Sequence, residues 1–308
     1  MLHHRQHDLV APDDHTIHMK VWLPENETSC VIHVLHGLGE HADRYERFAS
    51  SAVERGYAVC VHNHRGHGEC VDEPGHFADS DGWQKVNSDI EIVHEFIREQ
   101  FQTLPIVLLG HSMGSYIAQA FAMHYGPKLS GLILSASTWL SRLKLAPVQL
   151  LTRIETWRLG IRGKSALLDK VGFGNFNKPF MPARTEMDWL SRDEAEVDKY
   201  IADTLCGGPY SCGLWRDLIS GLFYISSDHA VIRIRSDLPI LITGGESDPV
   251  GGDDGMARLA MHYAQTSHQR LSVKIYPGGR HEMLNEINRD EVTADWLDWI
   301  AATTHTGR

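Results

Sequence analysis

The chain has 308 residues and a formal net charge of −11, with 29 Lys and Arg against 40 Asp and Glu. This length fits one large α/β domain with an insertion, and the acidic balance argues against a nucleic-acid partner, since phosphate binding depends on Lys and Arg. Residues 1–8 are polar and rich in histidine, and no stretch approaches the roughly 20 apolar residues of a membrane span, so a soluble cytoplasmic protein is expected.

The first part of the chain alternates predicted strands and helices. Residues 7–23 predict an antiparallel hairpin at the start of the fold. Continuous apolar runs then predict buried strands, and helical spacing of apolar residues predicts the segments between them. The strands are expected at 30–35, 57–61, 106–109 and 129–135, and the helices at 44–55, 83–101 and 115–125. This alternation predicts an α/β fold with a mostly parallel, doubly wound sheet.

The regular alternation stops near residue 136. Residues 137–236 contain aromatic and helical pieces, such as 139–159 and 193–206, and no comparable strand followed by a helix. We therefore expect core residues 1–136, a mainly helical cap at 137–236 and a second part of the core at 237–308. Between Trp139 and Lys170, seven Lys or Arg face two acidic residues. This basic segment is interpreted either as a cap surface that meets anionic lipid or as a solvated helix packed on the core.

The predicted sheet resumes after the cap. An apolar strand at 238–243 leads to Asp248, and a helix is expected at 256–263. The next strand, at 271–276, is followed by His281 on a glycine-rich loop, and a helix at 288–300 closes the chain. Asp248 and His281 thus both follow strands, at the edge where open α/β sheets hold their sites.

A G-x-S-x-G motif lies between the predicted strand at 106–109 and the helix that follows it. Gly110 and Gly114 flank Ser112 at the two positions where a side chain would crowd the strand and the helix of a tight turn. Strand, turn and helix are the context in which such a serine is exposed as a nucleophile. We therefore interpret Ser112 as the centre of the chemistry.

A serine nucleophile needs a base and a carboxylate that orients the base. Ser112, Asp248 and His281 are the candidates, in that chain order, and Asp237, Asp253 and Asp254 are nearby competitors of Asp248. The glycine-rich loop after the first buried strand brings the backbone N–H of Leu38 to the same edge. With the N–H of Met113, it is predicted to bind the oxyanion.

Five motifs together resemble the monoacylglycerol lipase and lysophospholipase group of the serine α/β-hydrolases. They are His36-Gly37-Leu38-Gly39-Glu40-His41, Arg65-Gly66-His67-Gly68, Gly110-His111-Ser112-Met113-Gly114, Gly245-Glu246-Ser247-Asp248-Pro249-Val250 and Gly279-Arg280-His281-Glu282. Cap residues 185–193 and 197–203 also resemble bacterial lysophospholipase-like members. The resemblance implies an α/β-hydrolase fold, hydrolysis of an acyl ester, the triad Ser112, Asp248 and His281, and Leu38 and Met113 as oxyanion donors.

The leading functional prediction is an enzyme that cleaves single-chain acyl esters through an acyl-enzyme intermediate. A proline-iminopeptidase-like aminopeptidase is the alternative, and it would use a cap carboxylate, with Glu186, Asp188, Glu194 and Glu196 as candidates. A non-catalytic binding protein with the same fold is the third interpretation. No cofactor or metal is expected, because the five cysteines lack C-x-x-C spacing and the histidines at 62, 64 and 67 lack a paired cysteine or carboxylate.

Overall fold

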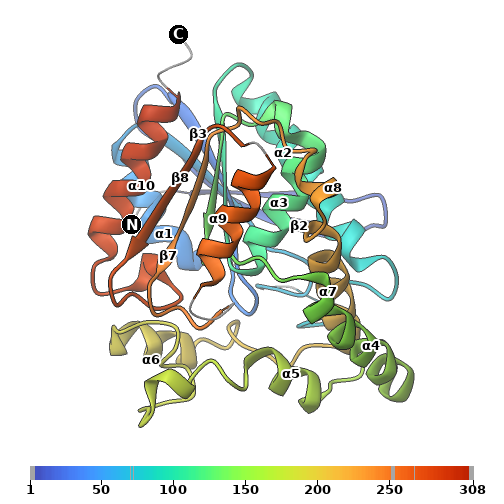
Figure 1. Ribbon diagram of the computed structural model, residues 1–308. Helices are drawn as coiled ribbons and strands as arrows, with labels where there is room; N and C mark the ends of the chain where they lie inside the picture. The colour runs from blue at the N-terminus through green and yellow to red at the C-terminus, as the bar shows by residue number, and fades with distance from the viewer. Residues whose placement is uncertain (1–3, 70, 72, 251–253, 267, 305–308) are drawn as a thin grey trace.

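The structure is a computed structural model, which describes residues 4–69, 71, 73–250, 254–266 and 268–304. Its centre is an eight-stranded sheet in the order β1-β2-β4-β3-β5-β6-β7-β8 (Figure 1). The pairs β1–β2 and β2–β4 are antiparallel, and the other neighbours are parallel. The strands are β1 (His4–Val10), β2 (Thr16–Trp22), β3 (Cys30–Leu35), β4 (Tyr57–His62), β5 (Ile106–His111), β6 (Gly131–Ser135), β7 (Ile240–Gly245) and β8 (Leu271–Tyr276).

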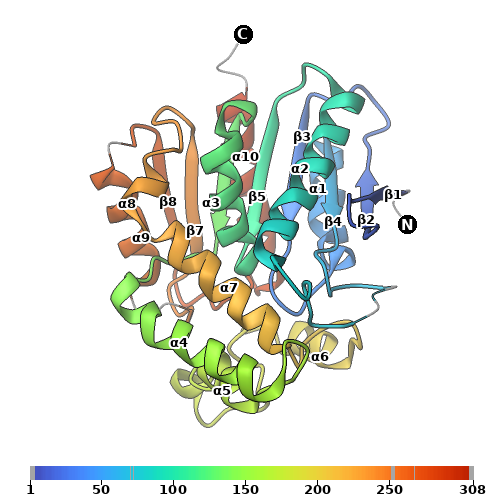
Figure 2. The same cartoon turned by 90° about the vertical axis from the view of Figure 1, so that its right-hand side faces the viewer.

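Helices cover both faces of this sheet, so the predicted doubly wound, mostly parallel arrangement is confirmed. On one face lie α1 (Glu46–Glu54) and α10 (Arg289–Thr304). On the other lie α2 (Gly82–Phe101), α3 (Met113–Tyr125) and α9 (Gly255–Gln265) (Figure 2). Short 3-10 turns at Ala42–Tyr45, Gly126–Lys128, Lys178–Phe180 and Met283–Asn285 join these elements. The central strands β3 to β7 are buried along their whole length, as their continuous apolar runs predict.

The segment between β6 and β7 carries five helices, of which α4, α5 and α6 lie below the sheet in both views, whereas α8 lies beside it (Figures 1 and 2). They are α4 (Arg142–Leu159), α5 (Ala166–Phe173), α6 (Glu194–Ala202), α7 (Cys212–Ile225) and α8 (Asp228–Val231). Helix α7 was not among the predicted helices. It packs against α4, α2 and α3, and Leu214, Leu218 and Leu222 lie on its buried face. No helix in the described part of the chain is long and apolar enough to cross a bilayer.

Candidate active site

Ser112 occupies a strained turn between β5 and α3. Its backbone has φ 50° and ψ −119°, a conformation that non-glycine residues rarely adopt. The two flanking glycines make this turn possible: a Cβ at Gly110 would lie 2.5 Å from the carbonyl oxygen of Gly114, and one at Gly114 would lie 2.1 Å from that of Leu35. The Ser112 N–H donates to the Ser135 carbonyl at 2.9 Å, which ties the turn to the neighbouring strand β6.

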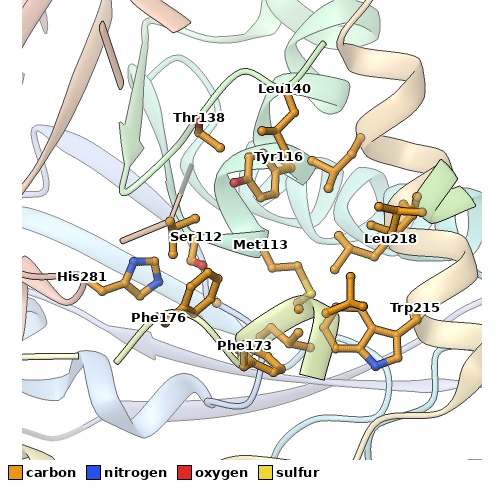
Figure 3. A pocket seen from close by; sticks show the side chains of 18 of the residues that line it. Ser112, Met113, Tyr116, Thr138, Leu140, Phe173, Phe176, Trp215, Leu218 and His281 are labelled. Carbon is orange, nitrogen blue, oxygen red and sulfur yellow. The ribbon is translucent and has the colours of Figure 1, made fainter. Parts of the chain in front are cut away.

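His281 and Asp248 form a buried pair on the loops after β8 and β7. The Nδ1 of His281 lies 2.9 Å from Oδ1 of Asp248, and both side chains are almost fully buried. Burial alone would lower the pKa of His281, but the charge and hydrogen bond of Asp248 outweigh it, and the pKa is raised above its usual value. With Nδ1–H donated to Asp248, Nε2 is the nitrogen left to exchange a proton. Figure 3 shows the imidazole ring beside the side chain of Ser112.

Leu38 and Met113 line the same cavity as Ser112 and His281. The loop that carries Leu38 comes close to the serine, since a Cβ on Gly37 would lie 3.3 Å from the Cβ of Ser112. Met113 is the first residue of α3, where backbone N–H groups have no partner within the helix. Among the described residues, neither the Leu38 nor the Met113 N–H donates to a backbone carbonyl. Their role as oxyanion donors stays a prediction.

A buried ionic network that the sequence analysis missed lies beside the histidine. The Arg44 guanidinium donates to both carboxylate oxygens of Glu282, at 2.6 and 2.7 Å, and to Glu40 at 3.2 Å. Glu40 also accepts from the Gly37 N–H and the Tyr45 hydroxyl. Burial opposes ionisation of Glu282, yet Arg44 lowers its pKa to about 2. The network therefore links Gly37 and Glu40, on either side of Leu38, to Glu282, the residue after His281. Glu40 and Arg44 are four residues apart, but nothing in the sequence pairs them with Glu282.

The cavity that contains Ser112 has a volume of about 370 Å³ and reaches into the cap (Figure 3). At one end lie Ser112, Met113 and His281. The rest of its wall is mostly apolar and aromatic and comes from α4, α5, α7 and the segment before α6. These residues include Leu145, Val148, Leu168, Phe173, Phe176, Trp189, Trp215, Leu218 and Leu222. The shape and lining suit a flexible apolar chain whose polar end meets Ser112.

The four cap carboxylates considered for an aminopeptidase lie elsewhere. Within the described residues, the acidic side chains that line the cavity are Glu40 and Glu282, both bound to Arg44. Glu196 pairs with Arg47 and Lys199, and Asp188 accepts bonds from residues 184 and 185. Glu186 and Glu194 are exposed. None of the four is placed to hold a substrate amine beside Ser112.

The loop at residues 62–68 lies next to this edge of the sheet and is largely buried. Arg65 is held by the carboxylates of Asp13 and Asp89, so it has a structural role in tying the loop to the hairpin and to α2. His64 and His67 pack around His36, with ring centroids 4.3 and 5.2 Å away. Burial holds the pKa of His67 at about 4, and that of His64 is also well below normal. These histidines are neutral packing groups.

Comparison with known proteins identifies the family to which the chain belongs. A family model described as serine aminopeptidase, S33, matches residues 26–288. The chain belongs to this family. A monoacylglycerol lipase of Mycolicibacterium smegmatis is 28% identical over 287 residues, with 92% of this chain and 91% of the relative covered. The human monoglyceride lipase is 29% identical over 317 residues, with 97% and 91% covered.

Solved structures agree with the fold. A thermostable carboxyl esterase from Bacillus coagulans, in complex with glycerol, superposes with a TM-score of 0.88 at 23% identity, covering 99% of this chain and all of the other. A monoglyceride lipase from Saccharomyces cerevisiae gives 0.75 at 18% identity, with 99% and 98% covered. The predicted α/β-hydrolase fold and the resemblance to the monoacylglycerol lipase group are therefore confirmed, as is the prediction of an enzyme of the ester-hydrolase class.

Proposed function

We propose that this family member hydrolyses monoacylglycerols and similar single-chain acyl esters, with Ser112 as nucleophile, His281 as base and Asp248 as its orienting carboxylate. The observation that carries the proposal is the buried His281–Asp248 pair, 2.9 Å apart, at the end of an apolar cavity that also contains Ser112. The relatives named as monoacylglycerol lipases support the substrate class. The same geometry argues against a non-catalytic binding protein, since binding alone needs neither the strained serine nor the paired histidine.

The reaction proceeds in two steps. The Oγ of Ser112 attacks the ester carbonyl while Nε2 of His281 takes its proton, and the N–H groups of Leu38 and Met113 bind the resulting oxyanion. The C–O bond to the alcohol breaks, and the alcohol leaves with the proton from His281. Water then attacks the acyl-enzyme with His281 again as base, which releases the fatty acid and restores Ser112.

An aminopeptidase remains the second candidate because it is named in the description of the family model. It is disfavoured by the cavity, whose acidic groups are already neutralised by Arg44 and whose wall is otherwise apolar. A panel of monoacylglycerols, lysophosphatidylcholine and aminoacyl amides decides between the two. We expect turnover of the single-chain esters; turnover of the amides alone would reverse the assignment.

The nucleophile is tested by Ser112→Ala. We expect ester hydrolysis to fall by about 10⁴-fold or more, because the remaining groups can bind substrate but cannot form the acyl-enzyme. Ser51→Ala, on the outer helix α1, is the matched control and should retain full activity. Both rates are measured with a p-nitrophenyl ester, and full activity in Ser112→Ala would rule out the mechanism.

We also propose that the cap meets anionic lipid surfaces. Leu143, Leu150, Ile154 and Trp157 lie along one stripe of α4, and Leu143 and Trp157 are 89% and 87% exposed. Exposed basic residues flank the stripe, namely Arg142, Lys144, Arg153 and Arg158. Exposed apolar side chains beside cations are typical of helices that lie in a membrane interface. Lys144, Leu145 and Val148 of the same helix line the cavity, so a lipid bound on this helix lies next to the cavity wall. The cytoplasmic location stays a prediction from the sequence.

Liposome co-sedimentation tests this surface. Binding should increase with the fraction of anionic lipid and decrease in the double variant Leu143→Ser with Trp157→Ser, because both the apolar contact and the charge attraction contribute. Hydrolysis of a short, water-soluble ester should be unchanged in that variant, which separates surface binding from chemistry. Binding that is independent of anionic lipid would leave the solvated-helix interpretation.

A further inference from the structure

A second cluster of reactive side chains lies where the cap contacts the loop after β3. The Gly207 N–H of the cap donates to the Gly39 carbonyl at 2.8 Å. The contact is close, since a Cβ on Gly39 would lie 2.1 Å from the hydroxyl of Tyr210. Gly39 is one residue from Leu38, and two residues after it His41 of the core lies against Asp203 and Cys206 of the cap.

Three possible metal ligands converge at this contact. Nε2 of His41 lies 2.8 Å from Oδ2 of Asp203, and one ligand atom from each of His41, Asp203 and Cys206 lies within 4.8 Å of the others. His41 is buried, while Asp203 and Cys206 are partly exposed, so an ion can reach the cluster from solvent. The turn at 203–206 is already ordered, because Asp203 accepts bonds from the N–H groups of Leu205 and Cys206.

We propose that His41, Asp203 and Cys206 form a zinc site that joins the cap to the core. Imidazole, thiolate and carboxylate are the ligands of zinc sites, whereas Mg²⁺ and Ca²⁺ prefer oxygen alone. Zinc binds its ligand atoms at about 2.0–2.3 Å. Side-chain shifts of about 1 Å would bring these three donor atoms to that distance from one ion. Water takes the fourth position, since three protein ligands are present.

The surroundings of His41 suit metal binding. On its other side, Nδ1 lies 3.7 Å from a carboxylate oxygen of Asp43, which is itself paired with Lys20. Metal-bound histidines commonly donate their second ring N–H to a carboxylate, which fixes the tautomer and ring orientation. Asp43 is close enough to Nδ1 to favour a proton there by its charge, and Nε2 lies 2.8 Å from Asp203. On binding, Zn²⁺ replaces the proton between His41 and Asp203 and the thiol proton of Cys206, and both protons pass to solvent.

Zinc at this position holds the cap loop against Gly39, one residue from Leu38. We therefore expect reversible inhibition of ester hydrolysis, since the loop can no longer move relative to the proposed oxyanion donors as substrate enters and product leaves. This kinetic consequence depends on the proposed function, but zinc binding does not. The two are measured separately for that reason.

Binding is tested on the full chain, kept reduced, by titration with Zn²⁺ against a chromogenic chelator and by absorption spectra with Co²⁺. We expect one ion per chain and a cobalt–thiolate absorption band. Cys206→Ala should abolish the band, and Cys206→Ala and Asp203→Asn should each weaken binding by about 10-fold or more. Two variants are used so that a folding defect in one does not decide the result.

The matched control is Cys212→Ala, which removes a buried cysteine six residues along the chain and should leave both the band and the affinity unchanged. Absence of saturable binding at micromolar zinc would overturn the site. So would binding that persists in both Cys206→Ala and Asp203→Asn, which would assign the ion to other histidines. Zinc binding with unchanged ester hydrolysis would retain the site and refute the link to catalysis.

Discussion

The carboxyl edge of the sheet and the cap contribute different things to the cavity. The edge supplies Ser112, His281 and Asp248 from short loops that each follow a buried strand, and their geometry depends on strained backbone and buried ion pairs. The cap supplies mostly apolar side chains to the cavity, from four separate segments of the chain. We therefore expect the edge of the sheet to determine the type of reaction and the cap to select the acyl chain of the substrate.

The strongest test of this division is Asp248→Asn. We expect kcat to fall by about 10⁴-fold for every acyl chain length, because an amide cannot hold His281 in the tautomer that accepts the serine proton. The ratio of rates for long and short esters should stay constant. A loss confined to long chains would show that the edge also selects the chain, and thermal unfolding of the variant checks that the fold is intact.

The core and the cap also differ in their histidines. Eleven histidines of the described residues are buried, all of them outside residues 137–236, which contain His229 alone. Six of the eleven form one group of contacting rings, namely His33, His36, His62, His64, His67 and His94. Burial lowers the pKa of all six, to about 3 for His62 and about 4 for His67 and His94, and well below normal for His33, His36 and His64. The folded core therefore keeps them neutral, while the unfolded chain takes up protons as the pH falls below about 6.5.

Because the unfolded state binds more protons there, the free energy of unfolding should fall as the pH decreases from about 6.5 toward 4. The expected loss is about 1 kcal/mol per buried histidine over the first pH unit. Urea unfolding at a series of pH values measures it. His33→Leu should give a shallower pH dependence than the unaltered chain, and an equal slope in both would contradict the assignment of neutral core histidines.

The smallest effect is expected in the cap, from Leu218→Ala. This change removes part of an apolar side chain that lines the cavity, so a long acyl chain loses contacts there. Hydrolysis of long-chain esters should therefore fall by about 10-fold, which is the effect of losing contacts to about one methylene group. Hydrolysis of an acetyl ester should change little, since its chain does not reach α7. An equal loss of activity toward both esters would mean that Leu218 supports the structure around Ser112 and does not contact the acyl chain of the substrate.

The core could be predicted because its signals are local. Strand runs, the glycines around Ser112 and the loops that carry Asp248 and His281 each occupy a few consecutive residues, and parallel strands bring their carboxyl ends together. The roles of these residues stay predictions, although the structure brings Ser112, His281, Leu38 and Met113 to one cavity.

Helix α7 and the ionic network could not be predicted in the same way. Helix α7 contains Gly213 and Gly221, which lower helix propensity, but a Cβ at Gly221 would lie 2.4 Å from the ring of Trp83. Close packing against α2 thus requires a residue that local propensity disfavours. Arg44 likewise meets Glu282 across 238 residues of chain, and only the folded sheet brings the two together.

Trp189, which lines the cavity, is joined to the loop that carries His281. The rings of Trp189 and His281 lie with centroids 4.9 Å apart, and the Glu282 N–H donates to the Leu190 carbonyl at 2.8 Å. The segment at 189–190 is therefore attached to the backbone that carries His281, the proposed base. If this segment moved to admit substrate, it would shift His281 and so disturb proton transfer in every catalytic cycle. Among the described residues, α4 has no such attachment to His281. We therefore expect that α4 can shift as substrate enters while His281 keeps its position beside Ser112.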